Sequence, residues 1–550
     1  MFETGLNVFM SPLKTTFEVL TNTDNAAAVH VLVNALDSRH PEIQRQAFHA
    51  ILARRNPAGH REILNRLHTL DPEWLDILQD YRGRMTAALR GALLDGDRRM
   101  CENGCRAVVL FREYDLVPIL TNALTDSTNP HAEMLGRALI ELAEALYDEL
   151  AHPRATKDRR DPQIVRNHVV DSMERAVQRF GEHRRQIIVE AFLLLVKRDN
   201  VTLKKILQDP HHPAFVTVVD LLSKSLRPGI IRLLLSFLND PYAPPVALSL
   251  LGKRYDLRFV RHLLQKVTRE PTPFTASNLK RIGTIGWLRG GGLVLDQLDE
   301  ELQRGAVQLV MQSGVPRLQI FGVLEYLLRH GKPDGRRAAA EALTDFNGAQ
   351  ANALTLEALA DEDPQVQAIA VTQLRRRGIP GALTRLVELV DSPHDVVRQA
   401  ARQTLEEFSF LRFVGAFDML DDDVRRSTGL LVKRIDPETI PLLKDEMKSP
   451  IRTRRLRAIA ICRAIDAERQ LENALTGLLR GDPDHVVRVE AAEALATCQA
   501  PSSRQALKSA LEDTSLAVRE AARKSLGYRE RPWTGDDLLS PREPFHDSRE

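Results

Sequence analysis

The residues most able to bind a charged ligand are five arginines among the twelve residues from 452 to 463, with no acidic residue between them. They are Arg452, Arg454, Arg455, Arg457 and Arg463. Guanidinium groups bind phosphate and carboxylate oxygens through paired N–H donors, so this arginine cluster is a candidate anion-binding or partner-binding site. Because side chains three positions apart are neighbours on a helix, the spacing predicts two short basic rows along adjacent sides of one helix.

Acidic residues that flank the arginine cluster in the sequence support a different interpretation. They lie within about one repeat length on either side and are Asp421, Asp422, Asp423, Asp445, Glu446, Asp466 and Glu468. Carboxylates of adjoining helices would neutralise the arginines, and most charge runs on protein surfaces are merely solvated. We therefore favour an intramolecular role for the cluster and keep nucleic acid or a phosphorylated protein as the alternative ligand.

Two groups of residues have the types that bind metals. Cys101 and Cys105 are four positions apart, which is one helical turn, but no third or fourth ligand follows at a recognisable spacing. Buried thiols are the simpler interpretation. Asp209, His211 and His212 form a polar group beside a proline, and a loop at the start of a helix explains them with fewer assumptions than a metal site.

The sequence contains no recognisable catalytic motif. The glycines 290–292 are preceded by no predicted strand and followed by no Gly-Lys-Ser/Thr, so a turn between helices is expected there instead of a phosphate-binding loop. No Ser/His/Asp or Cys/His set stands in a family-specific context. We expect a protein that is not an enzyme and has no metal or other cofactor.

Composition narrows the class of protein. The 76 basic and 74 acidic residues give a net charge of +2, so no global attraction to nucleic acid or anionic lipid is expected. The four cysteines include Cys462 and Cys498 and form no C-x-x-C pair, which fits a reducing compartment. No signal peptide and no apolar run long enough for a membrane span is evident, and we expect a cytoplasmic protein.

The chain is organised around a repeated helical pattern. In the segment 482–495, DPDHVVRVEAAEAL, Val487, Ala491, Ala494 and Leu495 fall on one helical stripe. Asp482 and the proline after it favour a helix start. The same pattern returns 31 residues later at Val518. A fixed period of this length predicts a tandem array of helix pairs.

Alignment of this pattern gives three columns over the C-terminal part of the chain. The first column, here called the slot, is Gly335, Val366, Val397, Val424, Leu456, Val487 and Val518, with spacings of 31, 31, 27, 32, 31 and 31 residues. The next residue is Arg336, Gln367, Arg398, Arg425, Arg457, Arg488 or Arg519. A small residue follows at Ala339, Ala370, Ala401, Thr428, Ala460, Ala491 and Ala522, as expected where neighbouring helices cross closely.

This pattern resembles the HEAT-repeat superfamily, and in particular its short, lyase-like (PBS-lyase-type) bacterial units, with the best match over residues 335–526. The resemblance implies an all-α fold, an α-solenoid of stacked antiparallel helix pairs. It also implies that the arginine after the slot pairs with an acidic residue of a turn and ties adjacent repeats together. Asp361, Asp482 and Asp513 lie five residues before their slots, but the other repeats have no acid there, so an interrupted ladder is expected. An iron-dependent hydroxylase branch of the superfamily uses His-Glu dipeptides, and none of the sixteen histidines here precedes glutamate.

We predict four regions along the chain. Residues 1–268 form a divergent N-terminal helical-repeat arm, 269–292 a proline- and glycine-containing hinge zone, and 293–526 a regular C-terminal array. Residues 527–550 are polar and proline-bearing and are expected to be a disordered tail. Its large apolar residues, which could cap the last repeat or dock a partner, are Trp533, Leu538, Leu539 and Phe545.

The functional expectation follows from the repeat. A curved rod of stacked helices presents a long surface, and such proteins usually hold another macromolecule. We therefore predict a protein-binding scaffold or adaptor whose partner is another protein. Nucleic acid is a less favoured partner, and a lyase-like or chromophore-handling subunit is the alternative from a different class.

Overall fold

A computed structural model describes residues 12–152, 160–269, 271–290 and 292–527, and within these ranges the only regular secondary structure is helical. The chain divides into two compact units, Met1–Ala339 and Ala340–Glu550. The all-α prediction is confirmed. The predicted hinge zone, residues 269–292, lies within the first unit, where Pro273–Lys280 is helical and begins with a capping box between Thr272 and Thr275.

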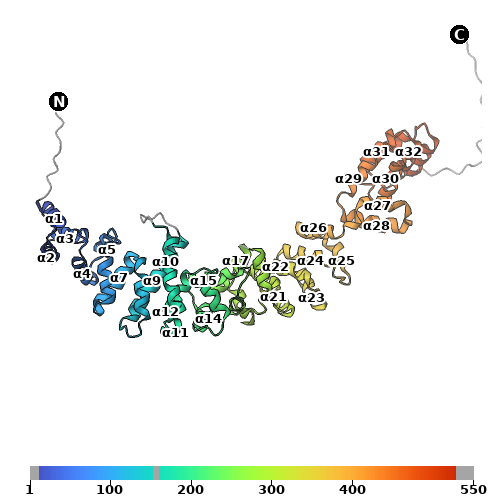
Figure 1. Ribbon diagram of the computed structural model, residues 1–550. Coiled ribbons are helices and arrows are strands. Elements are labelled where there is room, and N and C mark those ends of the chain that lie inside the picture. Colours follow the sequence, from blue (N-terminus) through green and yellow to red (C-terminus); the bar gives the residue numbers. More distant parts are fainter. Residues whose placement is uncertain (1–11, 153–159, 270, 291, 528–550) are drawn as a thin grey trace, which may run out of the picture. The chain divides into compact units, whose positions relative to one another are not determined.

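Unit 1 is a succession of helices in chain order (Figure 1). They are α1 (Pro12–Asn22), α2 (Ala27–Leu36), α3 (Pro41–Ala53), α4 (Pro57–Arg66), η1 (Leu67–Thr69), α5 (Pro72–Gln79), α6 (Thr86–Leu94), α7 (Arg98–Phe111), η2 (Tyr114–Leu116), α8 (Val117–Thr125), α9 (Ala132–Ala151), α10 (Pro162–Gln178), α11 (Phe180–His183), α12 (Gln186–Leu195), α13 (Val201–Gln208), α14 (Phe215–Lys224), α15 (Pro228–Ser236), η3 (Phe237–Asn239), α16 (Pro245–Lys253), α17 (Leu257–Arg269), α18 (Pro273–Lys280), η4 (Gly286–Gly290), α19 (Leu293–Asp296), α20 (Glu300–Gln312) and α21 (Arg317–His330). The unit boundary falls inside α22 (Pro333–Ala342).

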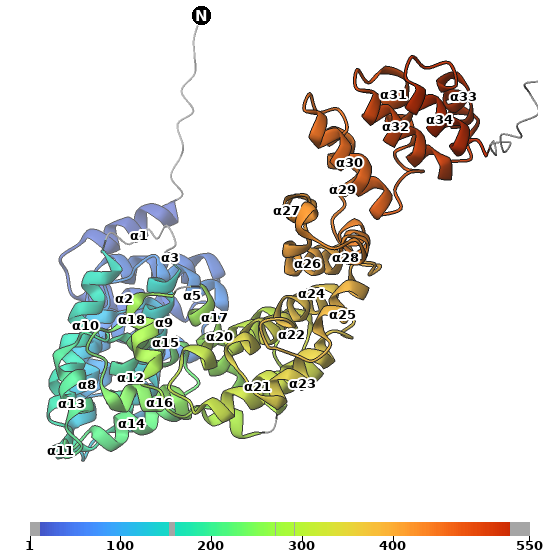
Figure 2. The same ribbon diagram turned by 90° about the vertical axis from the view of Figure 1, so that its right-hand side faces the viewer.

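Unit 2 continues the same helical pattern (Figure 2). Its elements are η5 (Leu343–Asp345), α23 (Ala349–Ala358), α24 (Pro364–Gln373), α25 (Ala382–Leu389), α26 (Asp395–Thr404), η6 (Glu406–Phe408), α27 (Phe410–Ala416), η7 (Phe417–Met419), α28 (Asp422–Ile435), α29 (Thr439–Glu446), α30 (Arg452–Ala464), α31 (Glu472–Gly481), α32 (His485–Ala494), η8 (Leu495–Thr497), α33 (Pro501–Ala510) and α34 (Leu516–Ser525).

Local sequence sets where these helices begin. The side chains of Asp97, Asp161, Asn200, Asp299 and Asp484 each accept a hydrogen bond from a backbone N–H in the first turn of the helix that follows. These N–H groups have no partner within the helix, so the cap stabilises the first turn. Several helices also have proline at their first or second position, where its missing N–H is no loss.

The helices of unit 2 form two layers, as expected for an α-solenoid. The slot helix α30 packs on α28 and α32, and α32 packs on α34, while α31 packs on α33 in the other layer. Val487, Val518, Ala491 and Ala522 are all fully buried between these helices. The predicted slot and small-residue columns are thus confirmed in these two repeats, since a buried alanine permits the close helix crossing.

The structure corrects the alignment of two repeats. In α30 the residue equivalent to Ala491 is Ala458, which is buried, whereas Ala460 is exposed. In α28 the small contact residue is Gly429, where an added Cβ would lie 2.6 Å from Ile465, and Val424 is exposed. The physical reason is the unequal length of these repeats, because a change of even two residues moves a position to another face of the helix.

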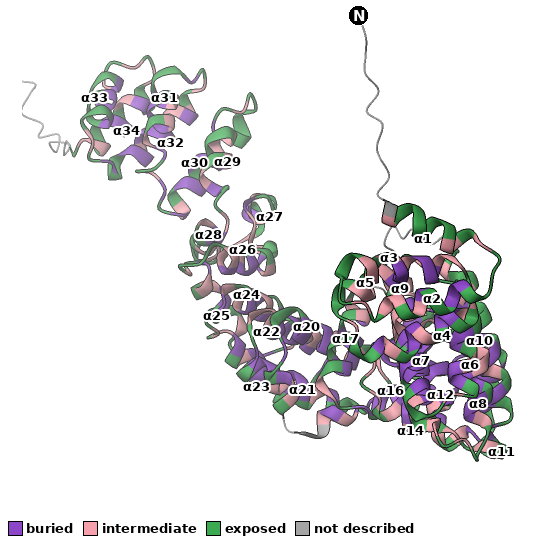
Figure 3. Cartoon of the chain, turned by 90° about the vertical axis from the view of Figure 1, so that its left-hand side faces the viewer, coloured by how far each residue is buried: buried purple, intermediate pink, exposed green. Residues whose placement is uncertain are grey.

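Burial is confined to the faces that helices turn toward their neighbours (Figure 3). The core is mostly Leu, Val, Ile and Ala, as the low aromatic content of 5% predicts. No helix among the described residues is long and apolar enough to cross a membrane. The tail residues Trp533, Leu538, Leu539 and Phe545 lie outside the described part of the chain.

Candidate anion-binding and partner-binding sites

The predicted arginine cluster lies on α30, and its most central member has a structural role. Arg455 is buried and donates from Nε and Nη2 to the carboxylate of Asp482, at 2.6 and 3.0 Å. Its Nη1 also donates to the carbonyl oxygens of Ser449 and Pro450. With every side of the guanidinium occupied within the protein, Arg455 ties α30 to the turn before α32.

Three other members of the cluster also pair with carboxylates. The Nε of Arg452 lies 2.9 Å from Asp484, a terminal nitrogen of Arg457 lies 3.4 Å from Asp418, and one of Arg463 lies 3.3 Å from Glu490. Arg454 is exposed and has no described partner. The geometry thus favours the intramolecular interpretation for most of the cluster and leaves Arg454 and half-exposed Arg452 for an external ligand.

A charge ladder between repeats exists where an acid precedes the slot. Arg488 donates from Nε and Nη2 to Asp513, each at 2.9 Å, as Arg455 does to Asp482 one repeat earlier. The hydrogen bonds from Arg488 hold the pKa of the Asp513 carboxyl below its ordinary value. The sequence alignment predicted Arg457 as the ladder residue of this repeat. In the structure Arg455, two residues earlier, makes the ladder contact, and Arg457 pairs with Asp418 instead.

The apolar side chains Met419 and Ile451 lie just before the slot helices α28 and α30, and Val424 lies in the first turn of α28; they are 84%, 50% and 43% exposed, respectively. Asp418 of η7 pairs with Arg457 of α30, so the turn that holds Met419 lies beside α30. We call these three residues and Arg454 the turn edge. Sequence reasoning missed the apolar members because single exposed hydrophobic residues are common.

Ile451 is also unusual for its position in the helix. It is the N-cap of α30 and makes no side-chain capping bond. The N-cap residues of the other slot helices from α24 to α34 are all polar, namely Asp363, His394, Asp421, Asp484 and Ser515. Isoleucine is a poor N-cap because it accepts no hydrogen bond from the free N–H groups, so its presence does not stabilise the helix.

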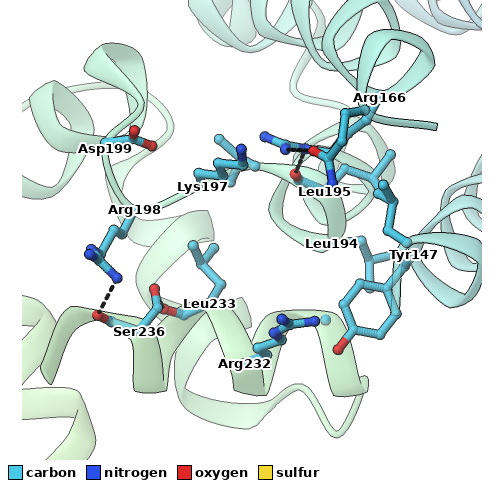
Figure 4. A pocket seen from close by; sticks show the side chains of 14 residues that line it. Tyr147, Arg166, Leu194, Leu195, Lys197, Arg198, Asp199, Arg232, Leu233 and Ser236 are labelled. Atoms are coloured by element: carbon cyan, nitrogen blue, oxygen red, sulfur yellow. Dashed lines mark hydrogen bonds between the residues drawn. The ribbon is translucent and has the colours of Figure 1, made fainter. Parts of the chain in front are cut away.

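A cavity of about 360 Å³ in unit 1 was not predicted from the sequence. Its walls come from the end of α9, the start of α10, the turn between α12 and α13, and α15, and Figure 4 shows the side chains around it. An added Cβ on Gly229 would lie 2.8 Å from the carbonyl oxygen of Leu194, so glycine permits α15 to approach α12 at this wall. Four basic side chains line the cavity, Arg166, Lys197, Arg198 and Arg232, with one acidic side chain, Asp199.

Arg166 is the most buried of these cations, at 7% exposed. Its Nε donates to the carbonyl oxygen of Leu195 at 2.8 Å, and Nη1 donates to Oε1 of Gln163 at 3.0 Å. Burial lowers the pKa of the Arg166 guanidinium, and the nearby Asp199 opposes this effect. Arg166 is therefore held in one orientation by neutral oxygens.

The remaining sequence candidates have structural surroundings. Cys101 and Cys105 are buried in α7, and a hydrogen bond with Cys101, together with burial, raises the pKa of the Cys105 thiol. Asp209 accepts from the backbone N–H of His211, and Nδ1 of His212 accepts from that of Ala214, as in a turn between helices. Gly292 has φ of 91° and precedes α19, again in a turn between helices.

Comparison with known families supports the repeat assignment. Residues 322–406 and 471–539 match the family model described as HEAT repeats. These two segments are thus similar to HEAT repeats. The slot helices α24, α26, α32 and α34 fall within them, whereas the shorter repeat around α28 falls between them.

Solved structures with some similarity to the chain include two of Kap121p. For Kap121p bound to Ste12p, the identity is 13% and the TM-score is 0.25, over 94% of this chain and 64% of that chain. For a mutant of Kap121p, the values are 10% and 0.21, over 94% and 72%. The chain thus spans somewhat less than two thirds of the first structure. No curated protein matches this sequence. The α-solenoid assignment rests on the layered helix pairs and the two HEAT segments.

Proposed function

We propose that this protein is a non-catalytic, cytoplasmic scaffold that binds another protein through the turn edge of unit 2. The observation that supports this proposal most is Ile451, an exposed apolar residue at a helix N-cap where the other repeats have polar residues. It contributes little to the local fold, and Met419 on the neighbouring turn is still more exposed. Binding of a partner would remove these exposed apolar side chains from water.

The charges beside these residues indicate the chemistry of the partner. Arg454 is exposed, and Arg452 is half-exposed beside Asp484. A partner segment that combines apolar and acidic side chains would bury Met419 and Ile451 and pair with Arg454. The resemblance to lyase-like repeats concerns the type of repeat, and the repeat itself supplies no catalytic residue. We therefore propose neither a chromophore nor a nucleic acid as the ligand.

Affinity capture from the native host tests this proposal. Met419→Glu/Ile451→Glu should lose a partner that wild-type protein retains, because two carboxylates would face the acidic segment. A Val216→Glu variant is the matched control, since Val216 is 73% exposed and lies in unit 1. Equal capture by all three proteins would contradict the proposal, provided that circular dichroism shows the three melting curves to coincide.

A further inference from the structure

The cavity lined by α9, α10 and α15 gathers four basic side chains and one carboxylate, Asp199, which forms an ion pair with none of them. Among the described residues, no acidic oxygen lies within ion-pair distance of Arg166, Lys197, Arg198 or Arg232. Arg198 makes one long hydrogen bond, 3.5 Å, to the carbonyl oxygen of Ser236. A buried guanidinium without an anionic partner is costly, so the arrangement favours an anion from outside the chain.

Other basic residues of unit 1 form ion pairs with carboxylates. Arg227, at the N-cap of α15, pairs with both Glu144 and Glu190. Lys204 of α13 lies 2.9 Å from Asp240, and Arg254 after α16 lies 2.8 Å from Asp256. Several basic side chains in this part of the chain are thus paired with carboxylates, whereas the four that line the cavity are not.

The positions of the cations suit a tetrahedral oxyanion. Figure 4 shows Arg166 and Lys197 on one side of the cavity and Arg232 on the opposite side. One terminal nitrogen of Arg166 donates to no described atom, while its other bonds fix the plane of the guanidinium. Fixed guanidinium donors and a mobile ammonium group around one space are the usual means of binding phosphate. The volume of about 360 Å³ lies in the range of small-ligand sites.

We propose that this cavity is a binding site for a phosphate group, supplied by a small phosphate compound or by a phosphorylated side chain of a protein partner. Arg166 is the fixed donor, and Lys197 and Arg232 close on the phosphate oxygens from opposite walls. The proposal does not rest on the turn edge, which belongs to unit 2, and each proposal is tested with its own variants.

Isothermal titration of the full chain with inorganic pyrophosphate tests the site. Wild-type protein should bind it with an affinity that falls as salt rises. Lys197→Gln/Arg232→Gln should weaken binding about tenfold or more, because two charge-assisted hydrogen-bond donors are lost. Both residues are exposed, so the fold should be unaffected. Arg258→Gln, an exposed arginine of α17 outside the cavity, is the matched control and should bind as wild type does.

A second titration separates the two sources of phosphate. A phosphoserine peptide that binds more tightly than pyrophosphate, and loses binding in the double variant, identifies a phosphorylated partner. The reverse order identifies a small phosphate compound. The proposal is overturned if neither probe binds beyond a potassium chloride control of equal ionic strength, or if Arg258→Gln weakens binding as much as the double variant.

Discussion

At the scale of single residues, the bidentate pair of Arg455 and Asp482 is the contact between repeats whose loss should cost most. Both side chains are almost fully buried, at 10% and 2% exposed. Removal of one partner would leave the other charge buried and unpaired, which is more costly than the net contribution of the intact pair. Arg454, the adjacent residue in the sequence, is exposed and unpaired among the described residues, so it offers a matched comparison.

We therefore expect Arg455→Gln to lower the free energy of unfolding by about 3 kcal/mol. Arg454→Gln should change it by less than about 0.5 kcal/mol, as surface substitutions usually do. Urea unfolding followed by circular dichroism measures both values, and hydrogen exchange over residues 452–495 locates the loss. Equal stability of the two variants would mean that the pair does not hold these repeats together.

The pair of Arg488 and Asp513 predicts how stability changes with pH. Because Arg488 lowers the pKa of Asp513 in the folded state, the charged carboxylate stabilises the fold. This contribution is complete above the ordinary carboxyl pKa, 3.8, and is lost as pH falls through the lower folded value. Asp513→Asn should thus be less stable than wild type at pH 7, and the two proteins should converge in urea unfolding below pH 4 or so. A difference that stays constant from pH 7 to pH 3 would contradict this account.

The sequence could predict the types of these residues but not all of their positions. The columns at Val487 and Val518 were found correctly because both repeats have the same length. The sequence favours Arg457 over Arg455 because the repeats around α28 are unequal: the small contact residues Ala401, Gly429, Ala458 and Ala491 are 28, 29 and 33 residues apart. Whether an additional residue lies in a turn or in a helix depends on how the helices pack, and this cannot be derived from a single sequence.

At the scale of helices, the buried alanines decide how closely the slot helices approach each other. Ala491→Leu and Ala522→Leu should each destabilise unit 2 by about 1 to 3 kcal/mol, because the larger side chain has no space between the helices. Ala460→Leu is the matched control, since Ala460 is exposed on α30 and leucine is also a good helix former. Thermal melts that lower the midpoint for all three variants alike would show that burial of the alanine is not the cause.

The proposed phosphate cavity is an example of a site that the sequence does not reveal, because its residues come from different helices. Arg166, Lys197 and Arg232 stand on separate elements and are more than 30 residues apart in sequence. Nothing in their local patterns distinguishes them from the many paired arginines of this chain. What distinguishes them is that they surround one cavity and that none of them forms an ion pair there, and this depends on how α9, α10 and α15 are placed in unit 1.

At the scale of the whole molecule, the regular period was enough to predict an α-solenoid, because each helix pair packs mainly on its neighbours in sequence. Because most repeats share one pattern, a repeat that differs from this pattern is a candidate for a role other than packing. The shorter repeat around α28 and the isoleucine at the start of α30 are two such departures, and the exposed residues of the turn edge lie at these two places. We infer that these departures serve the binding of a partner.

Site-specific photo-crosslinking in living cells tests this central claim most directly. A benzophenone side chain placed at position 419 or 451 should give the same discrete cross-linked protein, identified by mass spectrometry. The same side chain at position 216 in unit 1 should not give it. The account would be contradicted if positions 419 and 451 gave no product, or only the products obtained at position 216.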